Sequence, residues 1–237
     1  MPKQHEVISL MHMSDDLKRS AAEKAVADFI KDGQVIGLGT GSTAEYAIKE
    51  IGRLVAAGLK VRAIPTSLAA ERLAIQHAIP LVDFNDFPRI DVTIDGADQI
   101  DPAFNMIKGG GGALTREKLV ACATDLEVIV VDERKLVPVL GPGFPLPVEV
   151  VPFAWRRTAT LLEDLGSKPA LRVRDGKPVL TDNGNYVLDC DFGPIADCAG
   201  LERRIKLVPG VLECGLFVGL ADVMIVGRGA GAEIKRR

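Results

Sequence analysis

One central stretch of the chain holds the side chains best suited to chemistry. Asp95 and Asp98 follow a run of β-branched residues, Lys108 precedes the four glycines 109–112, and Glu117 comes shortly after them. A carboxylate removes a carbon-bound proton in proton-transfer reactions, and a cation beside uncovered backbone amides stabilises the oxyanion that develops. The stretch therefore predicts acid–base chemistry at an oxyanion.

The elements around these side chains follow from the local pattern. The run Ile90–Ile94 predicts a buried strand that delivers Asp95 at its carboxyl end, which is the edge where ligands bind in open α/β sheets. Apolar spacing from Leu114 onward predicts a helix with Glu117 in its first turn. Each motif alone also fits a turn, a dipole contact or a flexible linker, but their convergence favours a site.

A second motif predicts an anion-binding loop. The strand expected over 35–38 runs into a glycine-rich turn and a helix N-terminus, where backbone donors and the helix dipole act together, and hydroxyls surround Gly41 at Thr40, Ser42 and Thr43. A dinucleotide fingerprint does not fit because Ser42 replaces its third glycine and no acid ends the next strand. A P-loop does not fit because the Gly-Lys-Ser/Thr triplet is missing. A small phosphate ester fits better than a nucleotide.

The composition limits the class of protein. The chain has 237 residues, of which 47% are hydrophobic and 26% charged, a balance typical of a soluble α/β protein. A net charge of -3 gives no electrostatic basis for binding nucleic acid. Apolar runs are too short to span a bilayer, and the first residues lack a signal-peptide pattern, so we expect a cytoplasmic protein without a membrane or nucleic-acid partner.

Cysteines and histidines indicate no metal site. The cysteines lack the close paired spacing of zinc or redox motifs, so we expect them to be reduced and structural. His77 stands alone in a helical segment, and the other histidines precede residue 13. These residue types occur at Cys122, Cys190, Cys198, Cys214, His5, His12 and His77.

The first half of the chain alternates strands and helices. Ser14 with its acidic neighbours predicts a helix start, which places Lys18 and Arg19 in the first turns and leaves residues 1–13 as a loose extension. Such alternation implies a parallel sheet with right-handed crossovers. Further strands are expected at 60–64, 81–84 and 128–131, and helices at 67–78 and 114–124.

Proline and glycine density at 141–147 marks a boundary, after which the pattern changes to βαββαβ. Its segments are expected at 148–151, 155–165, 170–173, 179–188, 198–207 and 211–216, with a hairpin turn signal at 182–185. A last strand at 221–226 is expected to return to the first sheet, and 235–237 to be a solvated terminus. We therefore predict an α/β fold: a Rossmann-like, mostly parallel domain over 14–143 and 218–237, a ferredoxin-like α+β domain over 144–217, and the extension 1–13.

At this level of detail the chain resembles the type A ribose-5-phosphate isomerases. The resemblance covers nearly everything after Ser14, with Gly112 standing where alanine is common. It rests on GLGTGSTA at 37–44, DGAD at 95–98, KGGGGALTREK at 108–118, Lys135 in DERKLV, FPLPVEV at 144–150 and TDNGN at 181–185.

The resemblance implies interconversion of D-ribose 5-phosphate and D-ribulose 5-phosphate without metal or cofactor, in a homodimer or homotetramer. It implies that Glu117 moves a proton between C1 and C2, that Asp95 and Asp98 serve ring opening and hydroxyl proton transfer, and that Lys108 stabilises an enediolate. The implied substrate-binding positions are Lys18, Thr40, Gly41, Ser42, Thr43, Asp95, Gly96, Ala97, Asp98, Lys108, Gly109, Gly110, Gly111 and Lys135. Which of the hydroxyls and lysines hold the phosphate is left open.

Two functions of other classes compete with this hypothesis. A non-catalytic sugar-phosphate sensor would be expected to carry a helix-turn-helix segment, for which the stretch before Ser14 is too short. An acyl-CoA transferase-like enzyme would use a glutamate nucleophile and form a covalent intermediate. The isomerase explains more of the motifs than either alternative.

Overall fold

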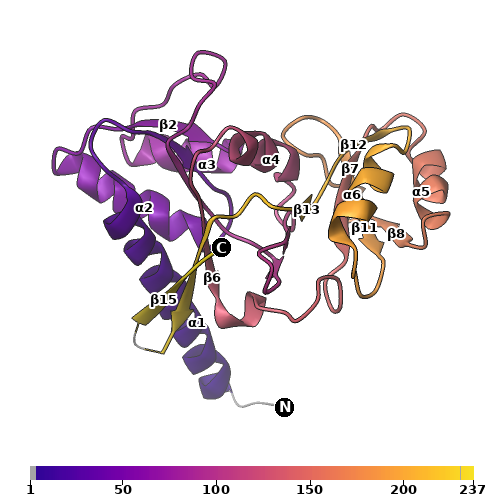
Figure 1. Cartoon of the computed structure of the whole chain (residues 1–237), viewed down its shortest axis with the longest axis horizontal. Coiled ribbons are helices and arrows are strands. Elements are labelled where there is room, and N and C mark those ends of the chain that lie inside the picture. Colours follow the sequence, from indigo (N-terminus) through magenta and orange to yellow (C-terminus); the bar gives the residue numbers. More distant parts are fainter. Residues whose placement is uncertain (1–3, 230) are drawn as a thin grey trace. The chain divides into compact units, whose positions relative to one another are not determined.

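The structure is a computed structural model that describes residues 4–229 and 231–237 (Figure 1). The chain divides into two compact units. The first unit comprises Met1–Gly96, Ala123–Lys135 and Ala221–Arg237, and the second comprises Ala97–Cys122 and Leu136–Leu220. This division assigns residues 97–122 to the second unit, whereas the sequence-based boundary places them in the first domain.

A mostly parallel sheet forms the centre of the first unit. Neighbouring strands are parallel except for the antiparallel pair β14 and β15. The apolar run 128–131 is almost fully buried, as expected for a strand covered on both faces. In spatial order the strands are β15 (Gly231–Arg236), β14 (Val223–Arg228), β6 (Glu127–Asp132), β3 (Val92–Asp95), β1 (Val35–Leu38) and β2 (Arg62–Pro65).

Three helices of the first unit pack through small and branched apolar residues. Helix α1 (Gln4–Phe29) contacts β6 and β14, and helix α2 (Ala44–Ala56) lies beside it. Gly227 of β14 allows the close approach of α1, because a Cβ there would lie 2.0 Å from the carbonyl oxygen of Leu17. Helix α3 (Leu68–Gln76) begins as predicted at Ser67, whose side chain accepts a hydrogen bond from the Ala70 amide.

The second unit contains the predicted ferredoxin-like motif. Its sheet is antiparallel and is covered by two helices whose apolar residues join the core formed around Val148 and Leu188. Along the chain the elements are β7 (Leu146–Val150), α5 (Trp155–Glu163), β8 (Lys168–Leu171), β11 (Tyr186–Asp191), α6 (Cys198–Lys206) and β12 (Val211–Cys214), in the sheet order β12-β7-β11-β8.

Shorter elements complete the second unit. A small sheet joins β4 (Gln99–Ile100), β5 (Met106–Ile107) and β13 (Leu216–Phe217), and a small hairpin joins β9 (Val173–Arg174) and β10 (Lys177–Pro178). Helix α4 (Leu114–Cys122) follows the glycine run and contacts β7 and β12. The predicted strand 170–173 is wrong in its bounds, since β8 spans Lys168–Leu171. The strand predicted over 179–188 resumes after the turn 182–185, where β11 begins at Tyr186, but β11 continues to Asp191.

Both ends of the chain differ from the sequence-based expectation. Helix α1 begins at Gln4 and not at Ser14, so the expected loose extension is wrong for residues 4–13, and residues 1–3 lie outside the described part. No proline or glycine interrupts the sequence between Pro2 and Gly33, which lets one helix run through. Lys18 and Arg19 consequently lie well inside the helix. Residues 235–237 were expected to be a solvated terminus, but Lys235 and Arg236 belong to the edge strand β15.

The segment 81–84 is not a strand. Leu81 forms a single bridge to Ala63, and the chain then turns where the Asp83 carboxylate accepts a hydrogen bond from the Asn85 amide at 2.8 Å. Aspartate and asparagine form such local turns readily, and here this preference outweighs a short apolar run. The predicted last strand is confirmed: β14 pairs with β6 of the parallel sheet.

Candidate active site

The glycine run in the second unit forms a tight loop between β5 and α4. Gly109 and Gly112 have φ values of +102° and +81°, in the left-handed region that favours glycine, and the Gly112 amide donates to the Gly109 carbonyl at 2.9 Å. A Cβ on Gly110 would lie 2.7 Å from an Asp98 carboxylate oxygen. The loop geometry therefore requires glycine at several of these positions.

Asp98 shapes this loop directly. Its carboxylate accepts a hydrogen bond from the Gly110 amide at 2.7 Å, and its own amide donates to the Ile107 carbonyl at 2.8 Å. With the Gly110 amide bound to Asp98 and the Gly112 amide bound within the loop, the amides of Gly109 and Gly111 make no hydrogen bond to any described residue. These two amides are the donors that the loop can offer to an oxyanion.

Lys108 and Glu117 form a buried pair at the two ends of the loop. The Lys108 Nζ lies 3.6 Å from Glu117 Oε1, and the side chains are 2% and 5% exposed. Lys108 is fixed through its amide, which donates to the Gly215 carbonyl, and its Nζ lies 5.5 Å from the centre of the Phe217 ring. Glu117 lies in the first turn of α4, as predicted. A carboxylate base and an ammonium group are thus held together out of bulk water.

Arg172 binds this loop from a distant part of the chain, and the sequence analysis did not predict this contact. Its guanidinium donates to the carbonyls of Gly109 and Gly110 at 2.9 and 3.0 Å and also pairs with the Asp189 carboxylate. Because it binds the carbonyl side of the loop, it fixes the peptide planes from outside. No local motif marks Arg172, and its partners lie far away in the sequence.

A second group of predicted residues lies in the first unit, at the carboxyl end of β3. Asp95 is 1% exposed, and its Oδ1 accepts hydrogen bonds from the amides of Thr40 and Gly96 at 3.1 and 2.6 Å. A Cβ on Gly39 would lie 2.3 Å from the same oxygen, so glycine is needed there. The strand end and the glycine-rich turn are therefore built around one carboxylate. Gly96 is the last residue of the first segment of this unit, and Ala97 is the first residue of the other unit.

The glycine-rich turn of the first unit borders an open cavity. Thr40 Oγ1 is hydrogen-bonded to the hydroxyls of Thr66 and Ser67 at 2.8 and 2.7 Å, which orients the start of the turn. Gly41 and Ser42 are exposed, and Thr43 precedes the first residue of α2. A cavity of ≈ 250 Å³ is lined by Gly39, Thr40 and Gly41 together with residues of α2 and α3. The turn thus lies at the N-terminus of α2, where the sequence predicts an anion-binding loop, and that role stays a prediction.

The two remaining predicted cations also lie in the first unit. Lys18 Nζ is 3.8 Å from the Asp15 carboxylate on the same helix. Lys135 is half-buried and ends the short 3₁₀ helix η1 (Glu133–Lys135), which follows β6. Burial would raise the pKa of Asp132 at the end of β6, but hydrogen bonds from Arg134 lower it below its ordinary value. That edge of the parallel sheet therefore carries an ionised carboxylate with Arg134 and Lys135 beside it.

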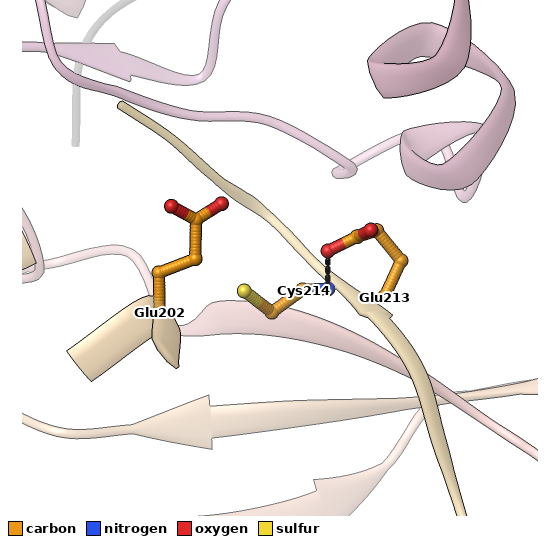
Figure 2. Close-up of side chains that lie close together, drawn as sticks. All are labelled: Glu202, Glu213 and Cys214. Carbon is orange, nitrogen blue, oxygen red and sulfur yellow. Dashed lines mark hydrogen bonds between the residues drawn. The ribbon is translucent and has the colours of Figure 1, made fainter. Parts of the chain in front are cut away.

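One acidic cluster of the second unit has the composition of a metal site. Glu202, Glu213 and Cys214 bring ligand atoms within 4.8 Å of one another, and Figure 2 shows the two carboxylates on either side of the Cys214 thiol. Lys118 Nζ, however, donates to both carboxylates at 2.7 and 2.9 Å. Burial alone would lower the pKa of Lys118, but Cys214, Glu213 and Glu202 outweigh it and raise that pKa. A lysine ammonium thus lies where a bound cation would interact with the carboxylates.

All four cysteines lie in the described part of the chain and form no disulfide. Cys122 is exposed, whereas Cys190, Cys198 and Cys214 are buried. Burial raises the pKa of Cys190 to about 12 and that of Cys214 to about 11. These buried thiols behave as small apolar side chains.

Across the described residues, no helix has the length and apolar character needed to cross a membrane.

Comparison with known proteins gives one consistent family. The family model for ribose 5-phosphate isomerase A (phosphoriboisomerase A) matches residues 62–231. The chain is 49% identical over 221 residues to ribose-5-phosphate isomerase A of Gloeobacter violaceus, covering 93% of this chain and 96% of that one. It is 50% identical over 226 residues to the protein of the same name from Desulfatibacillum aliphaticivorans, covering 94% and 96%.

Solved structures agree with the sequence relatives. The ribose 5-phosphate isomerase A of Methanocaldococcus jannaschii aligns with a TM-score of 0.90 and 43% identity, covering 94% of this chain and 100% of that one. A D-ribose-5-phosphate isomerase solved in complex with phospho-erythronic acid aligns with a TM-score of 0.91 and 41% identity, covering 94% and 99%. Fold and sequence therefore indicate the same relationship over nearly the whole chain.

Proposed function

The chain belongs to the ribose 5-phosphate isomerase A family, which interconverts ribose 5-phosphate and ribulose 5-phosphate in the pentose phosphate pathway, and we propose how its residues divide that chemistry. The observation that carries the proposal is the buried Lys108–Glu117 pair, with 3.6 Å between Nζ and Oε1. It combines a carboxylate base with a cation at a loop in which the amides of Gly109 and Gly111 bond no described residue.

Glu117 is the base of the isomerisation. In the open-chain aldose, its carboxylate removes the proton from C2, and the electron pair moves into a C1–C2 double bond as the C1 carbonyl oxygen becomes an oxyanion. The Lys108 ammonium and the amides of Gly109 and Gly111 stabilise this enediolate. A proton then passes from the C2 hydroxyl to the C1 oxyanion, which moves the charge to O2. As the C2 carbonyl forms, Glu117 returns the proton it removed to C1, which gives the ketose. One carboxylate serves both transfers because C1 and C2 are adjacent.

The two aspartates take different roles in this scheme. Asp95 accepts hydrogen bonds from two backbone amides, which fix its orientation, so its carboxylate is suited to accept a proton from the sugar hydroxyl during ring opening. Asp98 holds the Gly110 amide and so keeps the loop in the shape that presents its neighbouring amides. We assign the hydroxyl proton transfer mainly to Asp95 and the shaping of the loop to Asp98.

The phosphate is assigned to the turn at Thr40–Thr43 and the start of α2. Hydroxyls, a helix N-terminus and an adjoining cavity suit a small phosphate ester. Four further residues remain predicted contacts of the sugar phosphate: Lys18, Lys135, Gly96 and Ala97. A planar carboxylate resembles an enediolate, so the phospho-erythronic acid bound by a relative is a suitable probe of this chain.

The decisive experiment compares the wild-type enzyme with Glu117→Gln in excess chelator. Conversion of ribose 5-phosphate to ribulose 5-phosphate is measured with both proteins, and binding of phospho-erythronic acid is measured by calorimetry. We expect Glu117→Gln to lose turnover and retain binding. Glu163→Gln, which changes an exposed glutamate of α5 in the same unit, is the matched control and should keep full activity. Near-normal turnover by Glu117→Gln would overturn the assignment.

Family membership favours the isomerase over the sensor and the transferase considered from the sequence. We further propose a cytoplasmic enzyme that acts as a homodimer or homotetramer, with β8 and β12 as the edge strands of the second unit's main sheet available for pairing. Light scattering of the purified protein tests the oligomeric state, and a monomer at assay concentrations would refute this part.

A further inference from the structure

Glu149 is a buried carboxylate that the isomerisation scheme does not use. It lies in β7 and is 0% exposed. A buried ionised carboxylate is costly unless hydrogen bonds satisfy it. Glu149 accepts four from neutral side chains, namely Thr115 Oγ1 at 2.5 Å, Thr181 Oγ1 at 2.8 Å, Asn185 Nδ2 at 2.9 Å and Asn183 Nδ2 at 3.2 Å.

These donors come from two segments far apart in the sequence. Thr115 lies in the first turn of α4, two residues before Glu117, and the other three donors belong to the hairpin loop 181–185. The loop has its own order, since the Thr181 amide donates to the Asn185 carbonyl at 2.9 Å and the Gly184 amide donates to the Thr181 carbonyl at 2.9 Å. Glu149 therefore joins a preformed loop to the helix that carries the base.

Arg116 strengthens the same connection. Its guanidinium donates to Asn183 Oδ1 at 2.9 Å and to the Asp182 carbonyl at 3.0 Å. On the other side of Glu117, Lys118 binds Glu202 and Glu213. The residues flanking Glu117 are thus tied to the rest of the second unit. A helix of 9 residues is marginal by itself, so its orientation depends on such contacts.

We propose that Glu149 is a positioning residue for the isomerisation: together with the loop 181–185 it fixes the first turn of α4 and so directs Glu117 toward the substrate carbon. The proposal rests on the assigned role of Glu117. The sequence motif TDNGN then acts through the catalytic helix and not through contact with the sugar phosphate.

A carboxylate is required at this position because every partner donates. Glutamine would supply one oxygen and an amide group, and the Asn185 amide cannot become an acceptor for it without reversing its own orientation. Removing one donor is a milder change. Thr115→Val keeps the shape of the side chain and deletes its hydroxyl, whereas Thr115→Ser keeps the hydroxyl.

The test measures kcat, KM and the pH profile of kcat/KM for Thr115→Val, Thr115→Ser and Glu149→Gln. Because misplacement of a reacting group by about 1 Å costs on the order of 100-fold in rate, we expect Thr115→Val and Glu149→Gln to lower kcat roughly 10- to 100-fold. KM should change little, since the phosphate turn is untouched. The acid limb of the profile should shift because Glu117 changes its surroundings, and Thr115→Ser should restore kcat.

Thr160→Val is the matched control, because Thr160 in α5 binds the Arg156 carbonyl in its own helix at 3.1 Å. It should leave kcat and the pH profile unchanged. Wild-type kcat and pH profile in Thr115→Val, with a lower melting temperature alone, would show a structural role and overturn the proposal. If Glu149→Gln does not fold, the kcat and pH profile of Thr115→Val still test the positioning role.

Parallel measurement of Glu117→Gln separates the two hypotheses. An active Glu117→Gln refutes the assigned base, and with it the basis for positioning. An inactive Glu117→Gln together with a fully active Thr115→Val refutes the positioning role alone.

Discussion

Burial makes the Lys108–Glu117 pair important for stability as well as for catalysis. Both charges are removed from water, and each is compensated in part by the other across 3.6 Å. In such a pair, loss of one partner leaves the other charge buried with less compensation. Because Lys108 is only 2% exposed, its replacement is expected to affect the fold as well as turnover.

We predict that Lys108→Ala lowers kcat by about 10²- to 10³-fold, as for loss of one oxyanion donor. We also expect it to lower the free energy of unfolding by about 3–5 kcal/mol, the typical cost of breaking a buried ion pair. Urea titration measures the second effect. The double variant Lys108→Ala with Glu117→Gln should recover part of this loss, because it no longer buries an unmatched carboxylate. An equally unstable double variant would contradict the electrostatic explanation.

At the scale of elements, the glycine loop is shaped from two sides, by Asp98 at its amide side and by Arg172 at its carbonyl side. The loop thereby holds the amides of Gly109 and Gly111 in place before substrate arrives. Such preorganisation is what makes oxyanion stabilisation effective.

We therefore predict that Arg172→Ala lowers kcat by roughly 10- to 100-fold, because the loop peptides lose their fixed orientation. Steady-state kinetics measure the effect. Arg174→Ala removes an exposed arginine two residues away and should have no effect on kcat. A wild-type kcat in Arg172→Ala would show that Asp98 alone is sufficient to hold the loop.

The contact between α1 and β14 gives a second prediction at this scale. Gly227→Ala places a Cβ 2.0 Å from the Leu17 carbonyl oxygen, and backbone cannot move aside cheaply. We expect a loss of at least about 1–3 kcal/mol in the free energy of unfolding, as for overpacked cores. Gly231→Ala in the neighbouring strand β15 meets nothing within 4 Å and should be nearly neutral. Thermal unfolding of both variants measures the difference, and equal melting temperatures would contradict it.

The elements predicted from sequence are those with a strong local signal. Val35–Leu38 is the strand β1 as predicted, and Ser67 caps α3, because an apolar run and a capping hydroxyl act within a few residues. Glu117 lies in the first turn of α4 for the same reason. Arg172 could not be predicted, since its meaning depends on carbonyls more than sixty residues away. The edge strand β15 was missed because its polar sequence becomes extended through pairing with β14.

At the scale of the whole molecule, buried ionisable groups set the dependence of stability on pH. Burial would raise the pKa of Glu213, but Lys118, Lys206 and the Cys214 amide lower it below its ordinary value of 4.5. A lowered pKa stabilises the folded state above pH 4.5, and this contribution is lost as the pH falls through the folded value. The contribution of Lys118 to stability has the opposite pH dependence. Its pKa is raised, so it stabilises the folded state below pH 10.5, and this contribution is lost as the pH rises above that value.

We predict that the free energy of unfolding is greatest between these limits and decreases on acidification below pH 4.5. Glu213→Gln should be less stable at neutral pH and show a shallower acid dependence, because one carboxylate with a lowered pKa is gone. Denaturant titrations from pH 3 to pH 8 measure this slope. Parallel acid limbs for the two proteins would mean that other carboxylates, such as Asp132, account for it.

The chain passes between the two units at 96/97, 122/123, 135/136 and 220/221. Strand β14, which pairs with β6 and contacts α1, is therefore synthesised after all of the second unit. Until β14 has been synthesised, α1 lacks the strand that it contacts and β6 has an unpaired edge. An unpaired strand edge can pair wrongly with another strand. The second unit is complete once Leu220 has been made, whereas the first unit then still lacks β14 and β15, so during translation the second unit can complete its fold before the first.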